Sequence, residues 1–200
     1  MKMTALVEYR LGHRATFISN EWSVWGLPLA EGKSAQDPSS DLPPAVGKVI
    51  VPFSWWLEHQ DNAEIAKRTA HSEIAVWFDG TDDVLAHATV IEKSSVWPLV
   101  AVHFPIFTDG RGYSTAALLR ERLHWQGNIL AIGDVLIDQL RQMSRVGFDQ
   151  FSLRADQNQT LALKQFSLYS VNLQHAWRDS RSQFIQAAEH NCLEHELQAA

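Results

Sequence analysis

Apolar and polar residues alternate along the first part of the chain, a pattern typical of short β-strands with one buried face. The alternation covers residues 4–9, 15–18 and 22–25, with turn-forming residues between the runs. We therefore predict a small N-terminal antiparallel β arm over residues 1–30. Residues 31–47 contain Gly, Ser and three prolines, which indicates a linker or a long surface loop.

From residue 48 onward the pattern changes to continuous apolar runs separated by helical periods. The runs that predict buried strands are residues 49–51, 74–78, 99–104, 128–132 and 148–153. The predicted helices are residues 55–70, 84–92, 115–124, 134–145 and 160–169. Such alternation predicts right-handed crossovers and a parallel sheet. We expect an α/β domain over residues 48–200, its sheet open or curled like half a barrel, with a C-terminal helix from Trp177.

Composition and charge argue against several classes of function. The chain is 46% hydrophobic and carries eight tryptophans spread along it, which favours core and interface packing over a base-stacking platform. Its net charge of −6 argues against nucleic-acid and anionic-membrane binding, and no apolar run is long enough to span a membrane. Cys192 is the only cysteine, so no internal disulfide can form. We expect a cytoplasmic protein.

Charged side chains follow several of the predicted strands. Asp79, Asp109, Asp134 and Arg154 all come shortly after an apolar run, and parallel strands bring their carboxyl ends to one edge, where ligands bind. Such a group could hold Mg²⁺, supply acid and base, or orient a charged substrate. Capping of helices and turns is the alternative interpretation for each aspartate.

The segment Gly110-Arg111-Gly112 stands just before a predicted helix. Two glycines let the backbone N–H groups curl towards an anion, and the helix dipole adds favourable potential there. The alternative is a tight turn that needs glycine at positive φ. The Lys of a phosphate loop and the third Gly of a dinucleotide fingerprint are missing, so no cofactor is evident.

Arginine usage supports an anion site. Six arginines and no lysine occur between Lys93 and Lys164, and arginine suits bidentate binding of oxyanions. Asp138 and Arg145 share one helical face, where a solvated ion-pair ladder is the alternative. The anion-binding candidates are Gly110, Arg111, Gly112, Ser114, Arg120, Gln139 and Arg145. The catalytic candidates are Asp109, Asp134 and Asp138. His103 lies inside a predicted strand, and we interpret it as a core histidine with satisfied hydrogen bonds.

Five motifs at these intervals resemble one bacterial family. They are Phe104-Pro-Ile-Phe-Thr-Asp-Gly-Arg-Gly-Tyr-Ser114, Leu118-Leu-Arg-Glu-Arg122, Ala131-Ile-Gly-Asp134, Asp138-Gln139 and Arg145-Val-Gly-Phe148. Together they are similar to the family called domain of unknown function 934, over about residues 98–154. The resemblance implies a link to assimilatory sulfite reduction and association with the sulfite reductase haemoprotein. Where the family pattern has arginine and cysteine, this chain has Leu130 and Val146, so a thiol mechanism is not expected.

Two functions remain open from the sequence. The first is an accessory protein that assists or partners the sulfite reductase haemoprotein and carries an anion-binding site at the strand ends. The second is an enzyme acting on a small anionic substrate at Asp109, Arg111 and Asp134, with Mg²⁺ as an optional cofactor. Homo-oligomer formation is left open.

Overall fold

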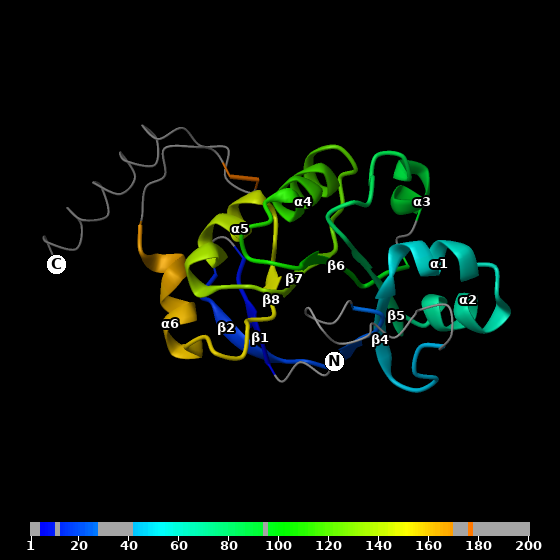
Figure 1. Ribbon diagram of the computed structural model, residues 1–200, viewed down its shortest axis with the longest axis horizontal. Coiled ribbons are helices and arrows are strands. Elements are labelled where there is room, and N and C mark those ends of the chain that lie inside the picture. Colours follow the sequence, from blue (N-terminus) through cyan, green and yellow to red (C-terminus); the bar gives the residue numbers. More distant parts are fainter. Residues whose placement is uncertain (1–4, 11–12, 28–41, 94–95, 170–175, 178–200) are drawn as a thin grey trace, which may run out of the picture.

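The computed structural model describes residues 5–10, 13–27, 42–93, 96–169 and 176–177. These residues contain a single eight-stranded sheet (Figure 1). The strands are β1 (Ala5–Glu8), β2 (Thr16–Ser19), β3 (Trp22–Val24), β4 (Lys48–Pro52), β5 (Ile74–Phe78), β6 (Leu99–Phe104), β7 (Asn128–Gly133) and β8 (Gln150–Phe151). Their order is β2-β1-β8-β7-β6-β5-β4-β3. Neighbours from β3 to β8 are parallel, and β1 is antiparallel to β2 and β8. The predicted α/β class with antiparallel N-terminal strands is confirmed.

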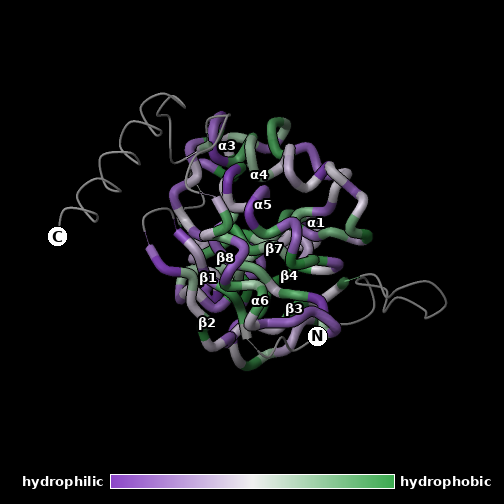
Figure 2. The backbone as a smooth tube through the Cα atoms, turned by 90° about the vertical axis from the view of Figure 1, so that its left-hand side faces the viewer, coloured by the Kyte–Doolittle hydropathy of each residue, from purple (hydrophilic) through white to green (hydrophobic). Residues whose placement is uncertain are grey.

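Among the described helices, the first five lie between consecutive parallel strands of the chain, and the last follows β8. They are α1 (Phe53–His59), α2 (Ala63–Ala70), α3 (Ala88–Lys93), α4 (Arg111–Glu121), α5 (Leu140–Val146) and α6 (Gln159–Lys164), with 3₁₀ turns η1 (Ile137–Gln139) and η2 (Gln165–Ser167). Strand order follows chain order from β3 to β8, so right-handed crossovers put the connecting helices on the same face of the sheet. Figure 2 shows α1, α3, α4 and α5 as a layer to one side of the strands.

Several helix boundaries differ from the sequence prediction: the helices predicted from residues 84 and 134 begin at Ala88 and, as η1, at Ile137. Two further differences affect the fold and the site. The helix predicted over residues 55–70 is split into α1 and α2, because the Asn62 side chain accepts hydrogen bonds from the N–H groups of Glu64 and Ile65 and starts a new helix. The helix predicted over residues 115–124 begins earlier, at Arg111. The second difference moves the Gly-Arg-Gly segment into the first turn of α4.

The sheet is curled, which confirms the half-barrel alternative. Its two edge strands, β2 and β3, follow each other in the chain with only Asn20 and Glu21 between them. Three peptide units span at most about 11 Å, so the end of one edge strand lies close to the start of the other. Asn20 fixes this connection, because its Oδ1 accepts from the Trp22 N–H (3.0 Å) and its Nδ2 donates to the Trp22 carbonyl (2.8 Å).

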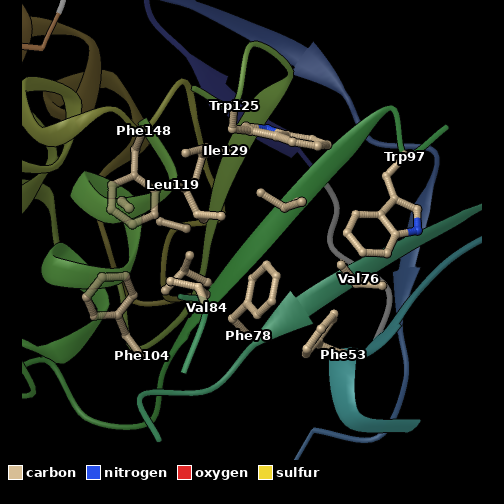
Figure 3. Close-up of a cluster of buried hydrophobic side chains, with 14 of the residues drawn as sticks. Phe53, Val76, Phe78, Val84, Trp97, Phe104, Leu119, Trp125, Ile129 and Phe148 are labelled. Atoms are coloured by element: carbon tan, nitrogen blue, oxygen red, sulfur yellow. The ribbon is translucent and has the colours of Figure 1, made fainter. Parts of the chain in front are cut away.

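The two faces of the sheet bury different clusters. The larger lies between the sheet and the helices, where Phe78 of β5, Phe104 of β6 and Leu119 of α4 meet (Figure 3). The inner, concave face carries a smaller cluster that includes Trp77, whose Nε1 donates to the carbonyl of Trp25 (2.9 Å). The described tryptophans that are buried are Trp55, Trp56, Trp77, Trp97 and Trp125, in line with the packing interpretation.

Two of the predicted segments fall mainly outside the described residues. Residues 28–41 hold most of the predicted linker, and residues 178–200 hold most of the predicted C-terminal helix. The N-terminal strands belong to the common sheet: β1 and β2 extend it beyond β8, and β3 extends it beyond β4. Within the described part of the chain, no helix combines the length and apolar character needed to cross a membrane.

Candidate functional site

The charged residues predicted to gather at the strand ends do so. The carboxyl ends of β5 to β8 are followed by residues 79–83, 105–111, 134–139 and 152–156, which we call the rim. In parallel α/β proteins this edge is where ligands bind, because loops and helix starts converge there.

Asp109 and Arg111 form the most tightly bonded pair of the rim. Arg111 donates from Nη2 to Asp109 Oδ2 (2.6 Å) and from Nε to Oδ1 (3.0 Å), and its backbone N–H donates to Oδ1 (3.1 Å). The guanidinium lies over Gly80, where a Cβ atom would come 3.0 Å from Nε. These hydrogen bonds hold the pKa of Asp109 below its usual range. The arginine side chain stays 54% exposed, so its outer surface is accessible.

The two glycines of this segment serve packing rather than an unusual backbone. Gly110 is the N-cap of α4 with φ −78°, and Gly112 does not have positive φ either, so the tight-turn alternative is wrong. Gly112 is required because a Cβ there would lie 2.7 Å from the Phe104 ring. Ser114 is an exposed residue of the same first helical turn.

Asp134 and Gln139 fix the loop between β6 and α4 from the neighbouring strand. Asp134 Oδ2 accepts from the backbone N–H of Phe107 (2.9 Å), and Gln139 Nε2 donates to the Phe107 carbonyl (2.7 Å). Asp134 Oδ1 also accepts from Arg154 Nη1 (2.7 Å). Asp134 is not the N-cap of η1 or α5, so the capping interpretation is wrong for this residue. The Phe-Thr-Asp-Gly-Arg-Gly, Gly-Asp and Asp-Gln motifs thus meet in one bonded unit.

A comparison with protein families agrees with these motifs. The family model described as "bacterial protein of unknown function (DUF934)" matches residues 75–184, more than half of the chain. The chain belongs to the DUF934 family. Neither the curated proteins nor the solved structures gave a match.

The two positions where this DUF934 member departs from the expected pattern are packing positions. Leu130 is fully buried in the inner-face cluster, and Val146 packs against the larger core at the end of α5. Neither side chain lies at the rim, since Leu130 sits in the middle of β7 and Val146 at the opposite end of the sheet.

The structure separates Arg120 and Arg145 from the rim. Both are near the C-terminal ends of their helices, at the amino ends of the strands. Arg120 is fully buried, pairs with Asp149 and donates to the carbonyls of Gly147 and Gly127 (3.0 and 2.8 Å). Arg120 fell on the apolar stripe of α4 with Ala116 and Leu119, a signal that could have marked it as a core residue.

The side chains of Asp138 and Gln139 have different surroundings although the two residues are neighbours in the chain. Asp138 is exposed, and its charge adds to burial in raising the pKa of Tyr113. Gln139 reaches inward to Phe107, as described above. No group of three or more His, Cys, Asp or Glu side chains in the described part of this DUF934 chain is arranged to hold a metal ion.

His103, the last but one residue of β6, lies beside the rim, and its surroundings differ from the sequence prediction. It is 6% exposed, yet its Nδ1 makes no hydrogen bond, so it is not a satisfied core histidine. The carboxylate of Asp79 lies 3.4 Å from that nitrogen without suitable hydrogen-bond geometry. Leu99, Ala101 and His103 occupy alternate positions of β6, and Leu99 and Ala101 belong to the inner-face cluster. This alternation could have predicted that the His103 side chain also points to the inner face, at the carboxyl end of the strand.

Proposed function

We propose that this DUF934 protein is an accessory protein of assimilatory sulfite reduction that docks on the sulfite reductase haemoprotein through the loop of residues 105–110. One observation carries the proposal. The backbone of Phe107 is held by Asp134 and Gln139, while the side chains of Ile106 and Phe107 are 51% and 43% exposed. Large apolar side chains displayed side by side on the surface favour a protein partner.

The loop is fixed before any partner arrives. Asp109 donates its backbone N–H to the Ile106 carbonyl (3.0 Å), which closes a turn inside the loop. Phe104 packs against Gly112, which anchors the loop to the start of α4. A surface held in one conformation loses little entropy on binding, so the apolar pair can contribute its burial to affinity.

The test is affinity capture from the native host under sulfate-limited growth. Tagged wild-type protein should retain the haemoprotein, and the Ile106→Asp/Phe107→Asp double variant should lose at least about tenfold of it, because carboxylates would be buried in an apolar contact. Val46→Asp is the matched control, since Val46 is an exposed apolar residue just before β4, at the other end of the sheet. Absence of the haemoprotein from the wild-type eluate, or equal capture by the double variant, would contradict the proposal.

A small-molecule enzyme is the second candidate function. It is favoured by the exposed guanidinium of Arg111, fixed by Asp109 at the start of α4, where an anionic substrate gains charge and helix-dipole stabilisation. In this scheme Asp109 and Asp134 supply acid–base chemistry. Equilibrium dialysis with phosphate esters, comparing wild type with Arg111→Ala, tests it. Equal retention by both proteins would remove its support.

A further inference from the structure

We propose that the C-terminal segment of the chain, residues 178–200, binds an apolar stripe on the outer side of α6 and η2. The stripe consists of Leu161, Leu168 and Tyr169. What covers it is therefore another part of the same molecule. This inference concerns a different surface from the docking loop and the rim, and it depends on neither.

The stripe is formed by side chains on one side of a continuous helical segment. α6 leads directly into η2, and Leu168, the C-cap of η2, still has helical φ and ψ angles. Leu161 and Leu168 stand two helical turns apart and therefore lie on the same side. They are 44% and 54% exposed, and the neighbouring Tyr169 is 68% exposed. A row of large apolar side chains on one side of a helix favours packing against a further element.

The other side of this helical segment already packs on the sheet. Ala162 is fully buried, and Phe166 stacks on the Tyr9 ring at 4.3 Å between centroids. Phe166 also packs against the ring of Phe151 in β8, at 5.5 Å. A surface helix needs one apolar side to bind its protein. The stripe is a second apolar side, which the core of the sheet does not cover.

The C-terminal segment begins close to the stripe. Arg141 of α5 donates from Nη2 to the Tyr169 carbonyl (3.2 Å), and its guanidinium lies over the Tyr169 ring at 4.6 Å. Arg145, one turn further along α5, accepts at its carbonyl from the Trp177 N–H (2.9 Å). One helical turn rises about 5.4 Å. The helix α5 thus holds the end of the stripe and the start of the segment side by side.

The sequence of the segment provides a complementary apolar side. Phe184, Ala188 and Cys192 follow Trp177 at intervals that place all four on one side of a helix. The Trp177 ring itself lies over the Arg120 guanidinium at 4.4 Å, so this side starts against the protein. Most of the stability of an amphipathic helix comes from packing its apolar side on another surface. The segment therefore needs such a surface.

Length and tethering favour the chain's own segment over a second molecule. The stripe from Leu161 to Leu168 is about 10 Å long, and residues 178–200 form about 34 Å of helix, so the segment can cover the stripe while Trp177 stays in place. A segment attached this close is present at an effective concentration on the order of millimolar. It therefore occupies the stripe before a second copy or another protein does.

Hydrogen exchange of the full chain, read by mass spectrometry, tests the inference. In wild type, residues 182–190 should exchange at least about tenfold more slowly than an unstructured peptide, because docking protects a helix. Leu161→Asp/Leu168→Asp should abolish this protection, since carboxylates are costly to bury in an apolar contact. Leu42→Asp/Val46→Asp is the matched control. These two residues are 78% and 89% exposed in the stretch before β4, and their variant should keep the protection.

Variants within the segment test the same contact from the other side. Phe184→Asp should abolish the protection, whereas Gln183→Asp adds the same charge on another side of the helix and should keep it. Circular dichroism shows whether each variant is folded, and if the stripe variant is not, the Phe184 and Gln183 variants decide. Unprotected amides in wild type, or protection that survives the stripe variant or Phe184→Asp, would overturn the inference. Protection that increases with protein concentration would also overturn it, because a second copy would then be the partner.

Discussion

Two arginines near opposite ends of α4 have contrasting surroundings. Arg111, the first residue of the helix, pairs with Asp109 at the surface, whereas Arg120, one residue before its end, pairs with Asp149 in the interior. Both are arginine–aspartate pairs, yet one guanidinium is 54% exposed and the other is fully buried.

The difference lies in how the guanidinium donors are used. Arg120 donates hydrogen bonds to Asp149 and to backbone carbonyls in the loops that precede β7 and β8. These bonds hold the two loops together in the interior of the protein. Arg111 donates hydrogen bonds to Asp109, and the rest of its guanidinium is exposed to solvent. Removing one partner of a buried, fully bonded ion pair destabilises the fold, because it leaves an uncompensated charge, while an exposed, fixed guanidinium is suited to ligands.

The largest expected effect tests the buried pair. Arg120→Met should lower the free energy of unfolding by about 3–5 kcal/mol, because it leaves Asp149 as an uncompensated buried charge. Urea denaturation followed by tryptophan fluorescence measures this. Adding Asp149→Leu should recover part of the loss. A cost below about 1 kcal/mol for the single change would show that the pair does not stabilise the fold.

A smaller effect is expected at the glycine that supports His103. Gly133→Ala should cost about 1–3 kcal/mol, because position 133 has φ +97° and a Cβ there would collide with the Phe104 carbonyl and the His103 ring. Gly110→Ala is the control. It has ordinary φ and open space around its Cα, so it should stay within about 0.5 kcal/mol of wild type in the same denaturation experiment.

The fixed loop can be loosened with a milder change. Asp134→Ala removes the acceptor for the Phe107 N–H and for Arg154, and should cost about 1–2 kcal/mol. Hydrogen exchange read by mass spectrometry should show faster exchange in residues 105–110. Asp138→Ala, which removes an exposed carboxylate nearby, should leave exchange there unchanged. Similar exchange in the two variants would mean that Asp134 does not hold the loop.

The smallest expected effect is on the pH dependence of the free energy of unfolding. Burial lowers the folded-state pKa of His103 below 6.5, so the unfolded chain binds this proton more tightly. The contribution of His103 to the free energy of unfolding is therefore full above pH 6.5 and declines as the pH falls below it. His103→Gln should show a flatter pH dependence than wild type from neutral pH down to about 5.5. An unchanged slope would indicate that His103 titrates normally.

Local patterns were enough to predict the order of elements and much of the rim. Continuous apolar runs marked β5, β6 and β7, and the crossover rule brought Asp109 and Asp134 to one edge. The choice between an open and a curled sheet could not be made from the sequence, because the curl depends on the short link between β2 and β3, which lie at opposite edges of the sheet. The break at Asn62 was missed because helical periodicity continues across it.

Side-chain roles were harder to predict than positions. Asp134 looked like a helix cap because its sequence neighbours fit one, while its actual partner, Phe107, lies 27 residues earlier in the chain. Arg120 was grouped with the anion-binding residues by residue type alone, and its interior partner Asp149 is equally remote. Such long-range pairs leave no local pattern, which is why the sequence predicted the rim but not how its residues are bonded.

The most direct test of the contrast between the two ends is a phosphate titration followed by amide NMR of ¹⁵N-labelled protein. We expect chemical-shift changes at Gly80, Gly110 and Gly112, beside Arg111, and none at Gly127 and Gly147, beside Arg120. Shifts centred on Gly127 and Gly147, or no shifts at any of these glycines, would contradict the assignment of the rim as the ligand-binding end.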